Sequence, residues 1–236
     1  MMKESIAIIP ARGGSKRIPR KNIKPFMGKP VMAYSIEAAI ESGMFSEVMV
    51  STDDPEIAEV AVKYGADVPF LRSESNSGDY ATTMDVIFEV LECYGHEGKH
   101  FDTVCCIYST APFITPERIR EAYRKIDEGY DSAFSVVAYG YPVQRALHLV
   151  DGNMCMLHPE YRDSRSQDLE TVYHDAGQFY VSTAKALQAT RSFWGDKTAG
   201  IVLPELEVQD LDTMTDWKLA EMKYRLLGKE DGSGLK

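Results

Sequence analysis

Residues 6–22 read Ile6-Ala-Ile-Ile-Pro-Ala-Arg-Gly-Gly-Ser-Lys-Arg-Ile-Pro-Arg-Lys-Asn22, an apolar run followed by a loop rich in glycine and positive charge. The apolar part is typical of a buried strand. Gly13 and Gly14 can adopt backbone angles closed to other residues, so successive N–H groups can converge on one cluster of oxygens. Five cations lie within ten residues of this loop: Arg12, Lys16, Arg17, Arg20 and Lys21. The stretch therefore predicts a polyphosphate site at the end of a strand.

The loop matches neither of two standard phosphate-binding patterns. G-x-G-x-x-G and G-x-x-x-x-G-K-[ST] are both absent from it, which argues against an ordinary Rossmann or P-loop site. A solvated basic turn is the alternative interpretation, because charged loops are common. Against it, the net charge of the chain is −10, whereas its first 29 residues hold eight Lys or Arg and one Glu. Local basicity in an acidic protein favours a small anionic ligand over nucleic acid, which needs a broad basic surface.

The length and composition indicate one globular unit. At 236 residues and 44% hydrophobic, the chain can bury the core of a single domain spanning residues 1–236. No apolar run approaches the roughly 20 residues that cross a membrane, and a signal peptide's apolar segment is absent from the N-terminus. We therefore expect a cytoplasmic protein without a membrane partner. The four cysteines lack paired zinc spacing, and we expect Cys105 and Cys106 to be reduced core residues.

Hydrophobic periodicity predicts alternating strands and helices. Strands are expected at 6–10, 47–54, 101–108, 133–138, 178–181 and 200–203, and helices at 30–42, 55–64, 80–94, 115–128, 183–190 and 215–227, the last capped near Thr215 or Asp216. This rhythm indicates an α/β fold: a mainly parallel sheet between helices on both faces, which is a three-layer α/β/α sandwich. In open sheets of this kind ligands bind at the carboxyl ends of strands, where the loop of residues 11–22 lies.

Residues 139–171 interrupt the alternation. They contain proline, glycine and many polar residues but no strong helical period. The segment is too long for a simple connector, so we interpret it as an inserted excursion of short strands or a hairpin. From the residues alone it is a structural appendage or a subunit contact.

The opening loop resembles a known signature. Residues 11–22, A-R-G-G-S-K-R-I-P-R-K-N, followed by G-K-P at 28–30, are similar to the nucleotide-binding motif of the cytidylyltransferases that activate nine-carbon acidic sugars, the family that includes CMP-sialic acid synthetase. The resemblance extends from Ile6 to Leu227. It implies a Rossmann-like nucleotidyltransferase sheet, CTP as the donor and pyrophosphate as the leaving group. In this family the stretch equivalent to 139–171 forms a dimerisation arm that covers the partner's active site, so the resemblance implies a homodimer.

The resemblance also implies roles on the nucleotide side. Loop residues would bind the triphosphate or fix the ribose, and the candidates are Ala11, Arg12, Gly13, Gly14, Ser15, Lys16, Lys21 and Asn22, with Arg12, Lys16 and Lys21 as catalytic groups. A second family segment surrounds the cytosine and ribose, and it matches Arg72, Asp79, Ala81, Thr82 and Thr83 here. From the bare residues, Arg72 is a surface arginine and Thr82 an ordinary helix residue.

Asp210 and Asp212 form the second strong motif. In an extended segment alternate side chains point the same way, so both carboxylates can face one hard cation. Magnesium on phosphate oxygens commonly uses one or two carboxylates. An isolated D-x-D pair is more often two surface acids before a helix. However, V-Q-D-L-D-T at 208–213, followed by a D-W-K-L-A-E helix, resembles the place where these enzymes hold their metal, which implies Mg²⁺ on Asp210 and Asp212.

The sugar side departs from the family pattern. Sialic acid synthetases resemble Q-P-T-S-P-L-R where this chain has Tyr108-Ser-Thr-Ala-Pro-Phe-Ile114, which indicates a different sugar. Residues 165–169 and 173–177 resemble the pseudaminic acid branch of the family. The sugar-binding candidates are Tyr108, Ser109, Arg145, Arg165, Gln167, His174 and Asp175. A guanidinium meets a carboxylate with two parallel hydrogen bonds, which favours the arginines, Arg165 first. A lone histidine such as His174 is equally often a structural residue.

Together these features imply an enzyme that joins CTP to an acidic nonulosonic sugar, with pseudaminic acid favoured, for bacterial surface glycans or flagellin. The alternatives are an enzyme that activates legionaminic or sialic acid, and a non-catalytic nucleotide-binding regulator, against which the pair Asp210 and Asp212 argues. The sugar's anomeric hydroxyl would attack the α-phosphate in line, with no covalent intermediate. This mechanism requires the basic loop and the acidic pair to meet.

Overall fold

The structure, a computed structural model, describes residues 4–229 of the chain. Its centre is a six-stranded sheet in the order β10-β6-β9-β5-β1-β4. The strands are β1 (Ser5–Pro10), β4 (Glu47–Ser51), β5 (Thr103–Ile107), β6 (Ser132–Ala138), β9 (Tyr173–Thr183) and β10 (Thr198–Val202). β1 is parallel to β4 and β5, and β10 is parallel to β6, whereas β9 runs antiparallel to both of its neighbours. The sheet is therefore mainly parallel, as expected.

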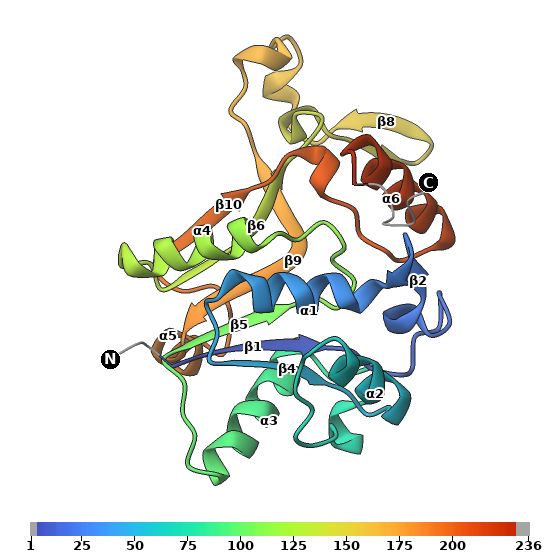
Figure 1. Cartoon of the computed structure of the whole chain (residues 1–236). Coiled ribbons are helices and arrows are strands. Elements are labelled where there is room, and N and C mark those ends of the chain that lie inside the picture. Colours follow the sequence, from blue (N-terminus) through green and yellow to red (C-terminus); the bar gives the residue numbers. More distant parts are fainter. Residues whose placement is uncertain (1–3, 230–236) are drawn as a thin grey trace.

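Helices cover both faces of this sheet (Figure 1). They are α1 (Val31–Ser42), α2 (Pro55–Lys63), α3 (Thr83–His96), α4 (Pro116–Asp127), α5 (Ala184–Thr190) and α6 (Met214–Leu226). Alternate residues of β1 enter two cores: Ala7 and Ile9 pack with α1, α2 and α4, and Ile6 and Ile8 pack with α3 and α5. This alternation follows from the period of two along a strand. The predicted three-layer sandwich is confirmed.

Several element ends differ from the prediction because local capping decides them. α3 begins at Thr83 rather than near residue 80, since Thr82 and Asp85 form a capping box. α6 is capped by Thr213 in a box with Asp216, so neither Thr215 nor Asp216 is its cap. Strand β9 begins at Tyr173, five residues before the predicted start, because its polar first half pairs with Val136–Ala138 of β6. All four cysteines are free, and Cys105 and Cys106 are buried as expected.

The segment of residues 139–171 contains a two-stranded hairpin, β7 (Leu147–Val150) with β8 (Asn153–Met156), and three single-turn 3-10 helices, Val143–Arg145, Pro159–Tyr161 and Ser166–Asp168. Figure 1 shows the segment projecting beyond the central sheet. Within residues 4–229, none of the helices has the length and apolar character that crossing a membrane requires.

Candidate active site

Buried polar contacts fix the basic loop that follows β1. Ala11 extends the pairing of β1 with β4, because its N–H donates to the Ser51 carbonyl at 2.9 Å. The buried Asn22 side chain donates to the Arg12 carbonyl at 2.8 Å and accepts from Ser109 Oγ at 2.9 Å. Asn22 therefore connects the loop at Arg12 to Ser109 and fixes the loop in position. Ser109 was expected to bind a sugar, and its hydroxyl is directed to Asn22.

Of the two loop glycines, Gly13 is explained by close packing, whereas a Cβ at Gly14 would meet no atom within 4 Å. Neither Gly13 nor Gly14 has φ in the left-handed region, so the expectation of unusual backbone angles is wrong. A Cβ at Gly13 would lie 2.7 Å from Asp54 Oδ2, and the Gly13 N–H donates to Asp53 Oδ1 at 2.9 Å. Gly13 is thus required by the close approach of the Asp53–Asp54 turn, and its N–H is committed to a carboxylate.

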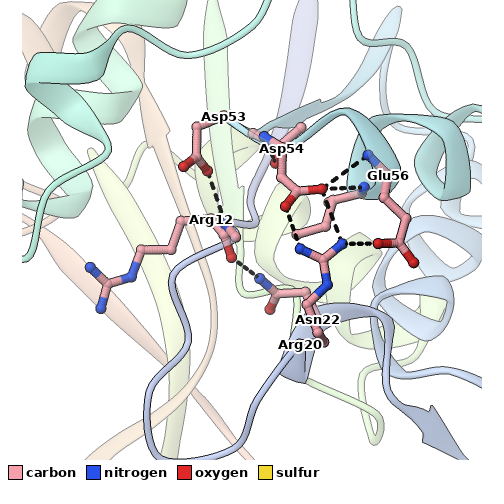
Figure 2. Close-up of polar contacts among 9 residues, drawn as sticks. Arg12, Arg20, Asn22, Asp53, Asp54 and Glu56 are labelled. Atoms are coloured by element: carbon pink, nitrogen blue, oxygen red, sulfur yellow. Dashed lines mark hydrogen bonds and ion pairs between the residues drawn. The ribbon is translucent and has the colours of Figure 1, made fainter.

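Arg20 belongs to the support of the loop. It has left-handed backbone angles, φ 55°, and its guanidinium forms ion pairs with Asp54 and Glu56. Figure 2 shows this cluster, with the Arg12 side chain extending in the opposite direction. The Arg20 guanidinium holds the pKa of the Asp54 carboxyl below its usual range, and Asp54 also caps α2 through the Glu56 and Ile57 N–H groups. The cluster fixes the loop against the start of α2.

The remaining cations surround a cavity of about 390 Å³. Its walls include loop residues and the start of the segment after β5, namely Arg12, Ser15, Lys16, Arg17, Lys21, Asn22, Asp79, Tyr108 and Ser109. Asp79 is the acid of this lining: it accepts a hydrogen bond from Arg12 at 3.0 Å and forms an ion pair with Lys16. These hydrogen bonds, Lys16 first, lower the pKa of the Asp79 carboxyl. Cations exceed acids here, so the cavity suits an anion.

The acidic pair reaches this loop because α6 packs against it. The Phe26 ring of the small strand β2 (Pro25–Phe26) lies 5.6 Å from the Trp217 ring and 5.4 Å from the Tyr224 ring of α6. Leu211 is fully buried in the same aromatic cluster, whereas Asp210 is exposed and Asp212 is half-buried. Burial of the central leucine therefore leaves both neighbouring carboxylates at the protein surface, with Asp212 beside the basic loop.

Lys21 and Arg17 join the two segments directly. The Lys21 ammonium donates to the Leu211 carbonyl at 2.8 Å and lies 3.8 Å from Asp212 Oδ1, and Arg17 forms an ion pair with Asp212 at 2.8 Å. Burial lowers the pKa of Lys21 from its usual range, an effect that Asp212 and Asp210 partly offset. The structure thus brings the basic loop and the acidic pair together.

The second nucleotide segment forms a neighbouring cavity of about 260 Å³, lined by Arg12, Arg72, Asp79, Ala81, Thr82, Thr83 and Tyr108, among others. Arg72 is only 8% exposed, so the bare-sequence interpretation as a surface arginine is wrong. Its Nε donates to Ser51 Oγ at 3.0 Å, and burial lowers the pKa of its guanidinium. Arg72 supports the end of β4 and contributes a buried positive charge to this cavity.

The sugar candidates separate into two groups. Tyr108, His174 and Asp175 line a third cavity of about 410 Å³, together with Asp210. Arg145, Arg165 and Gln167 lie on the projecting segment and line none of these three cavities. There, Arg145 donates to Ser166 Oγ at 3.3 Å and Arg165 forms an ion pair with Asp168 at 2.7 Å. Within one chain the structure does not bring these three residues to the cleft that the three cavities form.

Comparison with known proteins identifies the family. A family model described as Cytidylyltransferase matches residues 6–193. This chain belongs to the cytidylyltransferase family. It is 43% identical over 225 residues to pseudaminic acid cytidylyltransferase of Campylobacter jejuni, covering 94% of this chain and 97% of that protein. It is 36% identical over 228 residues to CMP-N,N'-diacetyllegionaminic acid synthase of Legionella pneumophila, covering 94% and 96%. The predicted family and nucleotidyltransferase class are confirmed.

The fold of this cytidylyltransferase also has a solved counterpart. A CMP:2-keto-3-deoxy-manno-octonic acid synthetase, solved in complex with CTP, superposes with a TM-score of 0.67 and covers 96% of this chain and 99% of its own, at 17% identity. At that identity the likeness concerns the fold, which is an α/β nucleotidyltransferase sheet. The predicted fold class agrees with it.

The donor set of the cytidylyltransferase fits a magnesium ion that is held mainly by phosphate. Among residues 4–229, three or more His, Cys, Asp or Glu side chains do not gather anywhere as a metal site. Mg²⁺ keeps several waters and is usually bound through one or two carboxylates plus substrate phosphates. Asp210 and Asp212 beside a cationic cavity match that requirement, whereas they do not make an all-protein cage.

Two contributors were missed from the sequence: Asp53 anchors the Gly13 N–H, and Tyr180 donates to Asp175 at 2.7 Å. Arg20 was expected among the cations of the phosphate site, and it instead pairs with Asp54. The pair Asp53–Asp54 at the end of a predicted strand was the available signal for the first, because polar residues at strand ends collect at the ligand edge of an open sheet. Tyr180 gave no signal, since an aromatic residue in a strand is usually core.

Proposed function

We propose that this cytidylyltransferase joins CTP and pseudaminic acid to give CMP-pseudaminic acid and pyrophosphate. The observation that carries the proposal is the 43% identity, along 94% of the chain, to the Campylobacter jejuni enzyme, against 36% to the Legionella pneumophila legionaminic acid enzyme. The cationic cavity beside Asp210 and Asp212 supports the CTP half of the reaction. Tyr108 lines the third cavity, which we assign to the sugar, and it supports a sugar other than sialic acid.

In the proposed reaction, the oxygen of the sugar's anomeric hydroxyl attacks the α-phosphorus of CTP in line, and the hydroxyl proton is lost to solvent. The bond from that phosphorus to the bridging oxygen breaks, and pyrophosphate leaves with the electron pair. Lys21, Arg12 and Lys16 would stabilise the charge that develops on the phosphate oxygens, and Asn22 keeps their loop in place. Catalysis then consists of positioning and electrostatic stabilisation.

Asp210 and Asp212 would hold Mg²⁺ against the triphosphate. When bound, the ion would draw charge from the phosphate oxygens. Arg17 forms an ion pair with Asp212 at 2.8 Å, so it would compete with a metal for that carboxylate. Binding of CTP would therefore exchange the Arg17 contact for contacts to phosphate and metal.

A homodimer is part of the proposal, with the segment of residues 139–171 as its arm. The hairpin register places Leu147 opposite Met156 and Leu149 opposite Met154, so these four apolar side chains share one face. Leu147, Leu149 and Met154 are 60%, 64% and 69% exposed. Contiguous exposed apolar surface marks interaction sites, and a second copy would cover this face while bringing Arg145, Arg165 and Gln167 to its sugar cavity.

The dimer is tested by light scattering. We expect twice the chain mass for the wild-type protein, and the chain mass for the double variant Leu149→Glu/Met154→Glu. A wild-type protein of the single chain mass would remove the arm from the scheme.

We place the reaction in the cytoplasm because CTP is available there.

The sugar is tested by offering CTP and Mg²⁺ with pseudaminic, legionaminic or sialic acid and measuring pyrophosphate release. We expect the highest kcat/KM with pseudaminic acid and a product with the mass of its CMP conjugate. A higher value with legionaminic or sialic acid would reassign the sugar. Binding of CTP by calorimetry without pyrophosphate from any of the three sugars would support the regulator instead.

A further inference from the structure

The Asp175 carboxylate is held in a fixed orientation on the wall of the third cavity, the one it shares with His174 and Asp210. Its Oδ1 accepts the Gly177 N–H at 2.8 Å, and its Oδ2 accepts the Tyr180 hydroxyl at 2.7 Å. A carboxylate offers about four lone-pair positions, so two acceptor positions remain after these bonds.

The Tyr180 hydroxyl has a defined orientation. Its one hydrogen is donated to the Asp175 carboxylate. The Tyr108 ring, which also lines the third cavity, lies 5.5 Å from the Tyr180 ring between centroids. Tyr180 therefore reaches Asp175 from a ring that other aromatic side chains surround.

Aromatic packing fixes the Tyr180 ring in position. The Tyr180 ring packs against Phe134 at 5.8 Å and Phe193 at 5.6 Å between centroids. Burial raises the pKa of both Tyr108 and Tyr180 above their usual range, so both stay protonated as donors. Tyr108 lines all three cavities of the cleft, and Thr83 lines the cavity of Arg72. Tyr108 thus lies between the predicted nucleotide side and the predicted sugar side.

The charge of the third cavity defines what Asp175 can bind. Its lining carries Asp175, Glu205 and Asp210, against Lys223 as the opposing cation. Lys223 donates to the Val208 carbonyl at 2.7 Å and the Glu205 carbonyl at 3.2 Å, so its ammonium is already engaged. Within one chain this lining is net negative, so the carboxylate of an acidic sugar needs cations that the wall of Asp175 does not supply. Asp175 suits hydroxyl or amide N–H donors, which a carboxylate binds with charge-assisted hydrogen bonds.

We propose that Tyr180 is a positioning residue of the sugar site, which orients Asp175 to accept hydrogen bonds from two donors of the sugar, hydroxyl or acylamino N–H groups. The proposal rests on the proposed function. It names the edge of the sugar that this wall recognises, which is an edge of hydroxyl or N–H groups and not the carboxylate.

The first test is Tyr180→Phe, which removes the hydroxyl and keeps the ring packing. Hydrogen bonds to a charged group are the stronger kind, and we expect KM for the sugar to rise about tenfold, with KM for CTP unchanged. Tyr94→Phe is the matched control. It removes a tyrosine–carboxylate hydrogen bond of 2.8 Å to Glu47. Glu47 is the first residue of β4, so it lies at the amino ends of the strands, whereas the cavities lie at the carboxyl ends. We expect wild-type kinetics for this control.

The second test separates positioning from a general effect on the fold. In an Asp175→Ala background, Tyr180→Phe should add no further rise in the KM for the sugar, because the group it orients is gone. If the alanine variant does not fold, Asp175→Asn replaces it, and the effect of Tyr180→Phe should then shrink. An equal effect of Tyr180→Phe in both backgrounds, or an equal rise in the KM for CTP, would overturn the proposal. Failure of the wild-type enzyme with every sugar would instead refute the proposed function.

Discussion

The Lys21 ammonium donates a hydrogen bond to the Leu211 carbonyl at 2.8 Å, across a separation of 190 residues. Leu211 stands between Asp210 and Asp212, so this bond ties the basic loop to the acidic pair. The aromatic packing of Phe26 on Trp217 holds α6 in the position that makes the bond possible. A cation and two carboxylates meet here at the mouth of a cavity, as the reaction of CTP requires.

Lys21→Ala should lower kcat/KM for CTP by at least about 100-fold while the protein stays folded. The variant loses a cation that stabilises charge on phosphate, and loss of one such group in a preorganised site costs a factor of this size. Pyrophosphate release measures the activity, and thermal unfolding monitors the fold. Lys125→Ala is the matched control, because Lys125 pairs with Glu128 at the end of α4, away from the cleft. Wild-type turnover of Lys21→Ala would contradict the assignment of Lys21.

Sequence patterns predicted the layers of the fold because these depend on local periodicity. The apolar run of β1 and the Thr115-Pro116 start of α4 are examples, and both are seen in the structure. The pairing of Asp79 with Arg12 was beyond prediction, since it joins residues 67 apart through tertiary structure. The role of Gly13 was mistaken for the same reason, because only the fold brings Asp54 against it.

Asp212→Asn should abolish most of the magnesium-dependent turnover, a loss of about 100-fold or more, because a neutral amide binds a hard cation poorly. Turnover is measured across a titration of MgCl₂ and in a chelator. Asp216→Asn is the control: Asp216 is four residues further along and accepts the Thr213 N–H at 2.7 Å in the cap of α6. That variant should lose thermal stability but keep its magnesium dependence. Full activity of Asp212→Asn, or wild-type activity in chelator, would remove the metal from the scheme.

Asp54→Asn should lower the free energy of unfolding at neutral pH by about 1 kcal/mol, as expected for one partly exposed ion pair. Asparagine still caps α2, so the loss reports the contact with Arg20. Arg20 lowers the pKa of the Asp54 carboxyl in the folded protein. The stabilisation that the ion pair gives is therefore complete above the usual aspartate pKa of about 4, and it is lost as the pH falls through the lowered pKa. The difference between wild type and variant in urea unfolding should therefore shrink from pH 7 to pH 3.

The control for that measurement is Glu59→Gln, an exposed acid on the same helix. It removes one negative charge without touching Arg20, and its stability difference at pH 7 should be near zero. A difference for Asp54→Asn that is equal at both pH values would show that the ion pair with Arg20 contributes nothing.

Asp79→Asn should tighten CTP binding several-fold. Asp79 accepts a hydrogen bond from Arg12 at 3.0 Å and pairs with Lys16, so it holds the cations that the triphosphate would use. An amide competes less strongly for them than a carboxylate does. Calorimetric titration with CTP at low and high salt measures the effect, which should be larger at low salt because exposed charges are screened. Glu74→Gln removes an acid from the same exposed segment and should leave the affinity nearly unchanged. Weaker binding by Asp79→Asn would mean that Asp79 positions Arg12 and Lys16 for the phosphates instead of competing with them.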